Sequence, residues 1–203
     1  MLRIVVCVSG GGTNLQALID AQASGIIHSG KIVLVLSSSP DAYALARAKK
    51  AGIPCVVCSR KTLGSQESFE AAIQQALEER AIDVIVLAGF MSILSEEFTR
   101  RWTGRILNVH PSLIPSFCGK GMYGLKVHEA ALARGVKVTG ATVHLVNEVP
   151  DGGPILLQRA VEVLPGDTPE ILQRRVMEQA EWVLLPQATE MVCTALEKGE
   201  KLK

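Results

Sequence analysis

The sequence predicts a single α/β domain, in which helices flank a mostly parallel, twisted sheet and the C-terminal part adds an antiparallel extension. The first observation is size, because 203 residues, 48% of them hydrophobic, are enough to bury one sizeable core. The second is that apolar runs without polar alternation recur along the first half, as in strands covered on both faces. The third is that helical patterns separate these runs, which is typical of right-handed βαβ crossovers.

Four strand–helix units are expected in the first half of the chain. The predicted strands span residues 4–8, 31–36, 55–58 and 83–88, and the predicted helices span residues 14–23, 41–51, 65–79 and 95–102. Thr13-Asn14 has the composition of a helix N-cap, and Gly52 that of a helix end. A fifth short strand is expected to end at the polar residues Asn108 and His110, because Pro111 prevents a helical continuation.

The second half of the chain predicts a different arrangement. A short helix over residues 127–134 ends at Gly135, and two strands over residues 139–146 and 155–163 follow. A tight Asp-Gly-Gly turn between these strands favours a hairpin-like, antiparallel extension of the sheet. The last helix has Pro169 at its first position and runs to about residue 199, with an interruption and a kink expected at Pro186.

Composition and charge exclude several classes of function. The formal net charge is +1, so no long-range field draws the chain toward nucleic acid or an anionic membrane. No stretch approaches the roughly 18 apolar residues of a membrane helix, and the N-terminal run lacks the features of a secretory signal. The five cysteines are an odd number, several of them within apolar runs, which is typical of a reducing cytoplasm. Cys55 and Cys58 are expected to be structural residues of a strand.

Two polar side chains at the end of the fifth predicted strand indicate chemistry. Asn108 and His110 are two residues apart, so on a strand both point to the same side. An amide donor beside a base suits a reaction in which an oxyanion develops while a proton moves. The alternative is a polar strand end whose groups are satisfied by local hydrogen bonds.

A glycine-rich loop, Ser9-Gly10-Gly11-Gly12-Thr13-Asn14, lies between the first predicted strand and the first helix. Glycines at that place let the backbone approach an anion, and the N-terminus of the helix favours phosphate. Leu15 stands where a dinucleotide fingerprint needs its third glycine, and the lysine of a P-loop is missing. The loop therefore suits a single phosphate group, and the alternative is a plain strand-to-helix turn.

One carboxylate and three further histidines are candidates for the same site. Asp151 lies on a loop with two following glycines, either as a functional carboxylate or as a turn-forming residue. His144, on the alternating strand before this loop, is interpreted as a core histidine. His128 is expected to be structural, a phosphate neighbour at best, and His28 to be on the surface.

An apolar loop is expected to form the wall of a ligand pocket. Residues 87–94 end the fourth predicted strand and continue, still largely apolar, through Phe90 to Leu94. Because loops are normally solvated, these side chains fit a pocket for a flat, partly apolar ligand. Ligands of open α/β sheets bind at the carboxyl ends of the strands, where the glycine loop, this apolar loop and Asn108 all fall.

Together these segments resemble the glycinamide ribonucleotide transformylase family, the folate-dependent formyltransferases of purine synthesis. The resemblance covers essentially the whole chain, and its motifs are the strand 4–8 with SGGGTNLQ, VLAGFM at 86–91, LNVHPSLIP at 107–115, GATVH at 140–144 and DGGPI at 151–155. The Asn-x-His-Pro-Ser-Leu segment with a downstream Asp-Gly-Gly is the specific part, and the glycine loop is less so. The resemblance implies a Rossmann-like formyltransferase fold in one domain, 1–203, with a phosphosugar-binding half, 1–105, and a catalytic and folate-binding half, 106–203.

The resemblance also implies an enzyme and its reaction. A formyl group would pass from the co-substrate 10-formyltetrahydrofolate to the amine of 5'-phosphoribosylglycinamide, in de novo purine biosynthesis. The products would be formylglycinamide ribonucleotide and tetrahydrofolate, and no metal is implied. Both partners are small molecules, with no nucleic acid and no membrane among them, and the protein is expected in the cytoplasm as a monomer or homodimer.

The resemblance assigns roles to individual side chains of this sequence. Asn108 would donate to the developing oxyanion, and His110 would polarise the formyl group or exchange a proton. Asp151 would pair with the imidazole and help to deprotonate the attacking amine. Glu181 matches the acid that contacts the substrate ribose. The phosphate cradle would be Gly12, Thr13 and Asn14, and the folate pocket would be Gln66, Met91, Ser92, Ile93, Leu94 and Asn108.

Three departures from the family pattern stand out. Ser92 and Gln66 stand where many relatives have arginines, which reduces the attraction for the glutamate carboxylates of a folate. The segment near residues 177–179 is one residue longer than usual. Residues 117–124 are rich in glycine and are expected to form a mobile flap beside the site. Two nearby cations are candidates to replace the missing arginines: Arg60 and Lys61.

Three competing functions are weighed against this interpretation. The methionyl-tRNA formyltransferase needs a C-terminal tRNA-binding domain, which a near-neutral chain ending at Lys203 is not expected to have. The formyltetrahydrofolate hydrolase needs an N-terminal regulatory domain, whereas here the first strand is expected to begin at Met1, and a phosphate loop favours a phosphorylated acceptor over water. A noncatalytic phosphosugar-binding module would leave Asn108, His110 and Asp151 as coincidences.

Overall fold

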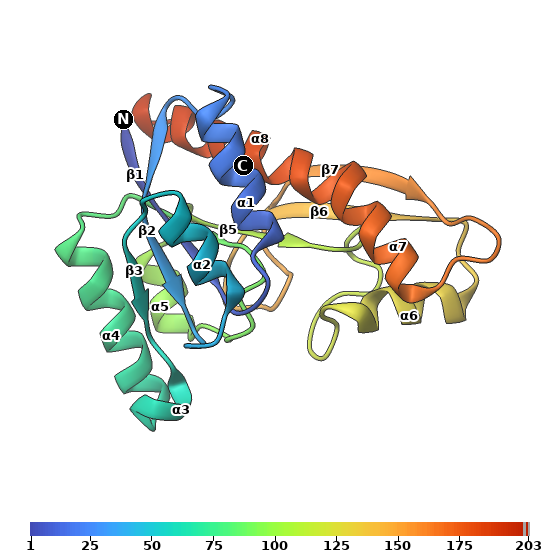
Figure 1. The fold of residues 1–203 in the computed structure, drawn as a ribbon, viewed down its shortest axis with the longest axis horizontal. Coiled ribbons are helices and arrows are strands. Elements are labelled where there is room, and N and C mark those ends of the chain that lie inside the picture. The colour runs from blue at the N-terminus through green and yellow to red at the C-terminus, as the bar shows by residue number, and fades with distance from the viewer. Residues whose placement is uncertain (201, 203) are drawn as a thin grey trace.

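Seven strands form one sheet in the computed structural model, which describes residues 1–200 and 202 (Figure 1). Their order across the sheet is β3-β2-β1-β4-β5-β6-β7. Strands β1 to β5 are parallel to one another, whereas β6 pairs antiparallel with β5 and β7 antiparallel with β6. The predicted fold class is therefore confirmed. The strands are β1 (Leu2–Val8), β2 (Gly30–Ser37), β3 (Cys55–Val57), β4 (Val84–Leu87), β5 (Ile106–His110), β6 (Val138–Leu145) and β7 (Ile155–Glu162).

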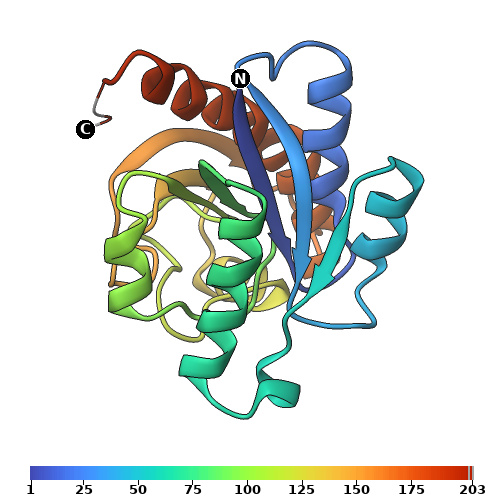
Figure 2. The same cartoon turned by 90° about the vertical axis from the view of Figure 1, so that its left-hand side faces the viewer.

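Helices cover both faces of the parallel part of the sheet (Figure 2). Along β1, Ile4 packs into the hydrophobic cluster beneath α1 and α8, whereas Val5 packs into the cluster beneath α4 and α5. Burial on both faces explains why these strands are apolar without alternation. The helices are α1 (Thr13–Ala23), α2 (Tyr43–Lys50), α3 (Arg60–Leu63), α4 (Gln66–Glu79), α5 (Glu96–Arg101), α6 (Leu125–Arg134), α7 (Pro169–Val176) and α8 (Trp182–Glu197), with a π-helical segment η1 (Met177–Glu181) before α8.

The elements expected before the last helix are all present, and their ends differ by at most two residues from the predicted ones. The short helix α3 was not predicted, because four mostly polar residues carry no helical period. The predicted N-cap of α1 is wrong: Gly12, with φ 72°, precedes the helix and Thr13 already belongs to it. A Cβ on Gly12 would lie 2.6 Å from the Ala44 Cβ, so close packing against α2 requires this glycine.

The interruption of the last helix lies before Pro186 and not at it. The π-helical segment η1 follows α7, and α8 then continues through Pro186. A π-helical turn holds one residue more than an α-helical turn, and η1 covers the segment near 177–179 that is expected to be one residue longer than in relatives. The break expected at Pro186 is wrong because this proline is the fifth residue of α8 and removes only the hydrogen bond to the Trp182 carbonyl.

Two further observations concern features that the described residues do not form. Within residues 1–200 and 202, none of the helices combines the length and the apolar character needed to span a membrane. No set of three His, Cys, Asp or Glu side chains in the same residues is arranged to hold a metal ion. Cys55 lies exposed at the start of β3 and Cys58 lies buried just beyond its end, and both thiols are free.

Candidate active site

The carboxyl ends of β1, β4 and β5 bring segments that are far apart in the sequence to one edge of the sheet (Figure 1). Ser9, the first residue after β1, accepts a hydrogen bond from the Met91 backbone N–H at 2.8 Å. The Ser9 hydroxyl also lies 2.6 Å from the Ser38 hydroxyl, just after β2. The glycine loop is thus tied to the apolar loop after β4, in agreement with the rule that ligand sites form at this edge.

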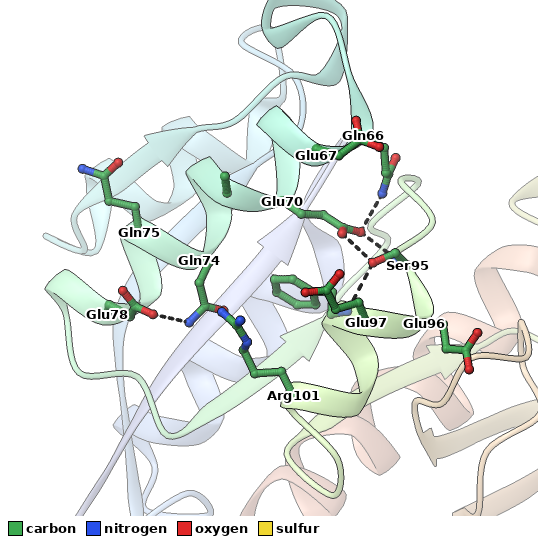
Figure 3. Close-up of a pocket in the computed structure, with 12 residues that line it drawn as sticks. Gln66, Glu67, Glu70, Gln74, Gln75, Glu78, Ser95, Glu96, Glu97 and Arg101 are labelled. Carbon is green, nitrogen blue, oxygen red and sulfur yellow. Dashed lines mark hydrogen bonds between the residues drawn. The ribbon is translucent and has the colours of Figure 1, made fainter.

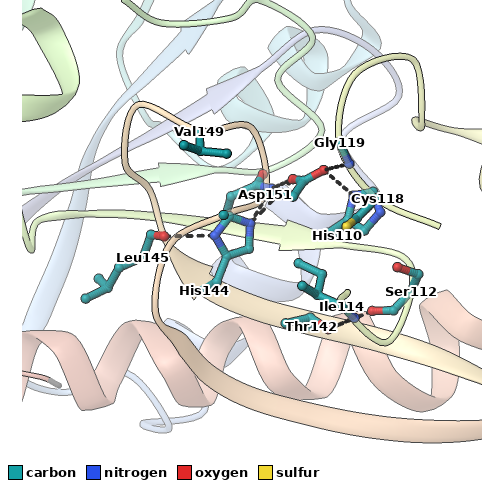
Figure 4. A network of polar contacts seen from close by, with 12 residues as sticks. His110, Ser112, Ile114, Cys118, Gly119, Thr142, His144, Leu145, Val149 and Asp151 are labelled. Atoms are coloured by element: carbon teal, nitrogen blue, oxygen red, sulfur yellow. Dashed lines mark hydrogen bonds and ion pairs between the residues drawn. The ribbon is translucent and has the colours of Figure 1, made fainter. Parts of the chain in front are cut away.

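The Asp151 carboxylate is the centre of a polar cluster (Figure 4). Its Oδ2 atom lies 3.5 Å from His110 Nδ1 and accepts a hydrogen bond from the Gly119 N–H at 2.8 Å. Its Oδ1 atom lies 3.5 Å from His144 Nε2 and 3.5 Å from Asn108 Nδ2. The structure therefore brings together the three predicted catalytic residues and adds His144 and the Gly119 amide.

The pairing of β5 with β6 positions the side chains of this cluster. Asn108 is opposite His144 in the antiparallel register, and the Asn108 Nδ2 atom lies 3.2 Å from His144 Nε2. Residues two apart on a strand share a face, so His110 lies on the same side as Asn108. Both side chains contact Asp151, which confirms the common orientation that the sequence predicts.

The loop between β6 and β7 holds Asp151 in an unusual backbone conformation. This loop spans residues 146–154 and is longer than the tight turn that was expected, because it folds back over the cluster. Asp151 has a φ of 57°, in the left-handed region that is costly for a non-glycine residue and is typical of functional sites. Gly153 is needed for close approach, since a Cβ there would lie 1.8 Å from the Leu145 carbonyl oxygen.

Asp151 is ionised despite its burial. Burial raises the pKa of the Asp151 carboxyl. The contact with His144, the hydrogen bond from the Gly119 N–H and the nearby charge of His110 lower it, and together they outweigh the effect of burial. The net pKa of Asp151 therefore lies below its ordinary value. Before any reaction, the cluster therefore holds the negative charge of Asp151 next to two imidazoles.

His110 is held between two hydrogen-bond acceptors. Its Nε2 atom lies 2.9 Å from the Phe117 carbonyl oxygen, and its Nδ1 atom faces the Asp151 carboxylate. A carbonyl and a carboxylate are both acceptors, so each nitrogen of the His110 ring faces a group to which an N–H can donate. His110 is thereby placed for hydrogen bonding and proton exchange within the cluster.

His144 is buried, as expected for a core histidine, yet it belongs to the cluster. Its Nδ1 atom lies 2.8 Å from the Leu145 carbonyl oxygen, which only accepts, so Nδ1 carries a hydrogen. With the hydrogen on Nδ1, the Nε2 atom accepts from the Asn108 amide at 3.2 Å. His144 thereby fixes the direction in which the Asn108 carboxamide faces. The sequence alone does not show that His144 is opposite Asn108, because this depends on how β5 pairs with β6.

The glycine loop presents an open backbone and has a cation beside it. A Cβ on Gly10 or Gly11 would meet nothing within 4 Å, so a ligand has room to approach these two residues. Arg47 of α2 donates from Nε to the Gly11 carbonyl oxygen at 2.9 Å. Sequence reasoning missed Arg47, because only tertiary packing brings α2 beside the loop. The position therefore suits an anion, and phosphate binding by Gly12, Thr13 and Asn14 stays a prediction.

Glu181 approaches the glycine loop from η1. Its Oε2 atom accepts a hydrogen bond from Asn14 Nδ2 at 2.7 Å, and both side chains are buried. Burial raises the pKa of Glu181 to about 7, against the lowering effect of the Asn14 bond. In the described part of the chain, the Asn14 Oδ1 atom is buried without a hydrogen-bond partner. The structure thus places Glu181 beside the predicted phosphate cradle, and Thr13 Oγ1 lies 3.7 Å from the Met177 sulfur.

The predicted folate-binding residues border two adjoining hollows of about 110 and 430 Å³. Met91 lines the larger hollow and Leu94 the smaller one. Gln66 lines neither, but its Nε2 atom donates to the Ile93 carbonyl oxygen at 3.0 Å. The hollows therefore meet at the polar cluster, with Gln66 behind their rim. The residues that line both are Phe90, Ser92, Ile93, Asn108, Pro150 and Asp151.

The glycine-rich segment 117–124 lies beside the site, as expected. It provides the Phe117 carbonyl that contacts His110 and the Gly119 N–H that contacts Asp151. Its glycines 119, 121 and 124 all have positive φ, so the segment follows a path that other residues would disfavour. Its mobility stays a prediction.

The two remaining histidines have no direct place in the cluster. The His28 side chain is 71% exposed and lies 3.2 Å from Glu190, which confirms the surface position expected for it. His128 is fully buried on α6, and neither ring nitrogen has a hydrogen-bond partner among the residues that the structure describes. Burial lowers the pKa of His128 to about 4, with a smaller effect of His110, so this ring is neutral.

Comparison with known proteins supports the same picture. The model of the formyl transferase family matches residues 2–189. The phosphoribosylglycinamide formyltransferase of Haemophilus influenzae is 46% identical over 179 residues, which are 88% of this chain and 82% of that protein. The trifunctional purine biosynthetic protein adenosine-3 of Bos taurus is 46% identical over 201 residues, which are 98% of this chain. The chain spans only 19% of the length of that trifunctional relative.

Solved structures share the fold over almost the whole chain. The glycinamide ribonucleotide transformylase 1 of Symbiobacterium toebii matches with a TM-score of 0.89 and 40% identity, covering 96% of this chain and 89% of that one. The phosphoribosylglycinamide formyltransferase of Brucella melitensis matches with a TM-score of 0.86 and 45% identity, covering 95% of each chain. A polar cluster at the carboxyl edge of a mostly parallel sheet is the arrangement of an α/β enzyme. The chain belongs to the formyl transferase family.

Proposed function

We propose that this chain transfers a formyl group from 10-formyltetrahydrofolate to the amine of 5'-phosphoribosylglycinamide, giving formylglycinamide ribonucleotide and tetrahydrofolate. The names of relatives that the chain covers almost completely support this reaction. The observation that carries the proposal is the Asp151 cluster, where a carboxylate, an imidazole and a carboxamide converge beside a hollow of about 430 Å³. These groups match the needs of formyl transfer to an amine.

The side chains of Asn108 and His110 are assigned to the oxyanion. When the amine attacks the formyl carbon, a tetrahedral intermediate forms and its oxygen becomes negative. Asn108 Nδ2 and His110 donate hydrogen bonds to that oxygen. Donors that are already in place, in a site that excludes water, stabilise this charge most effectively. His144 acts through Asn108, because it holds the carboxamide with its N–H groups toward the cluster.

The Asp151 carboxylate is assigned to the movement of the proton. The attacking amine loses one proton during the reaction, and the leaving nitrogen of tetrahydrofolate gains one. Asp151 is ionised before the reaction and takes up the proton from the amine. His110 supplies the proton to the leaving nitrogen and is recharged through its contact with Asp151. One proton thus crosses the site in each turnover.

The nucleotide is assigned to the glycine loop. The backbone amides at Gly12, Thr13 and Asn14 open α1 and hold the phosphate, and the Arg47 guanidinium adds positive charge. Glu181 accepts a hydrogen bond from a ribose hydroxyl. The buried Asn14 Oδ1 atom offers an acceptor on the same side.

The formyl donor is assigned to the two hollows, with Ser92, Ile93 and Leu94 around the pterin and Met91 and Gln66 toward its tail. We keep as part of this proposal one functional unit with a phosphosugar-binding half, 1–105, and a catalytic and folate-binding half, 106–203. The hydrogen bond between Asn14 and Glu181 crosses that division, so each half contributes to the nucleotide site.

The first test measures tetrahydrofolate release by the purified protein, with 5'-phosphoribosylglycinamide and, in parallel, with no acceptor. Release is expected only with the nucleotide. Asp151→Asn keeps the size of the side chain but removes its charge, and it should lower kcat by about 10²- to 10⁴-fold. The matched control is Glu129→Gln, an exposed carboxylate on α6, which should leave kcat unchanged. Equal release without acceptor would indicate hydrolysis, and no release in either tube would contradict the proposal.

A further inference from the structure

The loop that follows β5 returns to the polar cluster with two backbone groups. The Phe117 carbonyl oxygen lies 2.9 Å from His110 Nε2, and the Gly119 N–H donates to the Asp151 carboxylate at 2.8 Å. Phe117 has a φ of 50°, in the left-handed region that is costly for a residue other than glycine, so the surrounding structure must hold this conformation. The orientation of the His110 ring therefore depends on what fastens the loop.

A row of side chains across three strands leads from His110 to the edge of the sheet. Thr142 of β6 is opposite His110 of β5, and Gln158 of β7 is opposite Thr142. Residues directly opposite one another on antiparallel strands share a face of the sheet, so the three side chains lie on the same side. His110 and Thr142 are buried, whereas Gln158 is exposed on the last strand.

Thr142 connects this row to the loop (Figure 4). Its hydroxyl donates to the Ser112 carbonyl oxygen at 2.7 Å and accepts from the Ile114 N–H at 3.1 Å. It also accepts from Gln158 Nε2 at 3.0 Å. A hydroxyl has one hydrogen and two acceptor positions, so these three bonds use all of them. The Ser112 hydroxyl in turn donates to the Ser116 carbonyl oxygen at 2.6 Å, directly before Phe117.

Gln158 makes a second bond to the same loop. Its Nε2 atom also donates to the Ile114 carbonyl oxygen at 3.0 Å, so both hydrogens of the amide group are used. The N–H and the carbonyl of Ile114 are thus bound by Thr142 and by Gln158. A side chain without N–H groups at position 158 would leave two acceptors without this donor, and the loop would be free to shift relative to β6.

We propose that Gln158 is a positioning residue for formyl transfer: together with Thr142 it holds the loop after β5 in the place where the Phe117 carbonyl faces His110. This inference rests on the proposed function, because it assumes that His110 acts in that reaction. Gln158 lines neither of the two hollows, so its effect on the rate passes through His110. A displacement of about 1 Å in a catalytic group can lower the rate by about 10²-fold.

The first experiment measures kcat and both KM values of Gln158→Leu, which removes the amide at similar size. We expect kcat to fall about ten-fold and each KM to stay within about two-fold, since the proposed substrate contacts are unchanged. The matched control is Gln74→Leu, in the groove of about 650 Å³ between α4 and α5 (Figure 3). Gln74 also makes two side-chain hydrogen bonds, to Glu78 at 2.7 Å and from Trp102 at 3.0 Å, and its loss should leave kcat unchanged.

The second experiment tests whether Gln158 and Thr142 act as one unit. Thr142→Val removes the hydroxyl and should lower kcat by at least as much as Gln158→Leu does. Thr142→Ser keeps the hydroxyl and should retain most of the wild-type kcat. The double variant Thr142→Val with Gln158→Leu should be no slower than Thr142→Val alone, because both changes release the same loop. Urea unfolding of each variant shows that the kinetics are measured on folded protein.

Four results would overturn the inference. They are an unchanged kcat in Gln158→Leu, an equal loss in Gln74→Leu, a rise in KM as large as the loss of kcat, and separate effects that multiply in the double variant. If Thr142→Val does not fold, the exposed Gln158→Leu variant decides alone. Formyl transfer by the wild type is measured in the same series. If the wild type transfers the formyl group and Gln158→Leu does so equally well, the inference alone fails; if the wild type does not transfer it, the proposed function fails as well.

Discussion

Two carboxylates of the candidate active site have pKa values shifted in opposite directions. The pKa of the partly buried Asp151, in the polar cluster, is lowered, whereas the pKa of the buried Glu181, beside the glycine loop, is raised to about 7. The two differ in depth of burial and in the donors around them. Asp151 faces two imidazoles, an amide side chain and a backbone N–H, while Glu181 receives a single hydrogen bond, from Asn14.

The comparison shows that burial and donors together decide whether a carboxylate keeps its charge: Asp151 is less buried and has several donors, and Glu181 is more buried and has one. Asp151 is ionised before the reaction and is therefore free to accept a proton from the attacking amine. Glu181 is half-protonated near pH 7, so its charge depends on what occupies the site. A ribose hydroxyl that donates to Glu181 would supply the donor that the protein itself does not.

The largest effect, on kcat, is expected when one of the groups that contact Asp151 is removed. His110→Asn removes the imidazole that contacts Asp151 and that is assigned to the oxyanion. We expect kcat to fall by about 10²- to 10⁴-fold, because a positioned acid is lost. Steady-state kinetics at saturating donor measure this effect. The dissociation constant of the nucleotide should stay within about two-fold, and a loss of nucleotide binding as large as the loss of kcat would assign His110 to binding instead.

The next effect concerns stability and has the opposite pH dependence for the two carboxylates. Because the folded-state pKa of Glu181, about 7, is above its ordinary 4.5, the folded protein binds this proton more tightly than the unfolded chain. The free energy of unfolding is therefore highest below pH 4.5 and decreases as the pH rises to about 7. For Asp151 the sign is reversed: its contribution is present above the pKa of the unfolded carboxyl and is lost as the pH falls through the lower folded pKa.

Glu181→Gln should remove the Glu181 part of this pH dependence. The amide cannot ionise, so above pH 7 the variant should be more stable than the wild type by up to roughly 3 kcal/mol. Urea unfolding at pH 5 and at pH 8 measures the difference, which should be present at pH 8 and small at pH 5. Equal stability of the two proteins at pH 8 would show that Glu181 is not desolvated. The acid side of the profile, to which Asp151 contributes, should be unchanged.

A smaller effect is expected from the loop that presents Asp151. In Gly153→Ala the new Cβ would lie 1.8 Å from the Leu145 carbonyl oxygen, so backbone must move. We expect a loss of about 1–3 kcal/mol in stability together with a lower kcat, since Asp151 is displaced. Gly10→Ala is the matched control for stability, because nothing lies within 4 Å of its Cβ. If both variants unfold at the same denaturant concentration, the close packing at Gly153 contributes nothing to the free energy of unfolding.

Features that depend only on residues close together in the sequence could be predicted, whereas features that depend on packing between distant elements could not. Asn108 and His110 are two residues apart on one strand, so their common orientation depends only on the strand period. Asp151 was found because the glycines after it mark an unusual loop. His144 and Arg47 were not found, since the first needs the β5–β6 register and the second needs the packing of α2 beside the glycine loop.

The last helix shows the same limit in the backbone. A proline can be recognised from the sequence alone, and for this reason the interruption of the helix was predicted at Pro186. The π-helical segment instead connects two contacts: Val176 lies in the core just before it, and Glu181, its last residue, bonds to Asn14. Five residues separate these two positions, and a π-helical turn places them on nearly the same face. The spacing was visible in the sequence as one extra residue, but only the contacts at both ends explain it.

The smallest expected effect is on the pKa of Glu181, when the one hydrogen-bond donor to its carboxylate is removed. Asn14→Ala removes the 2.7 Å hydrogen bond to Oε2 and leaves the burial of the carboxyl largely as it is. A hydrogen bond to a charged group contributes about 1.5 kcal/mol, so the pKa of Glu181 should rise by about one further unit. The pH at which stability levels off should move upward by the same amount. Thr13→Val, whose hydroxyl contacts the Met177 sulfur instead, should leave that pH unchanged. A midpoint that does not move in Asn14→Ala would mean that burial alone sets the pKa of Glu181, and that the donors around Asp151 have less influence than their number suggests.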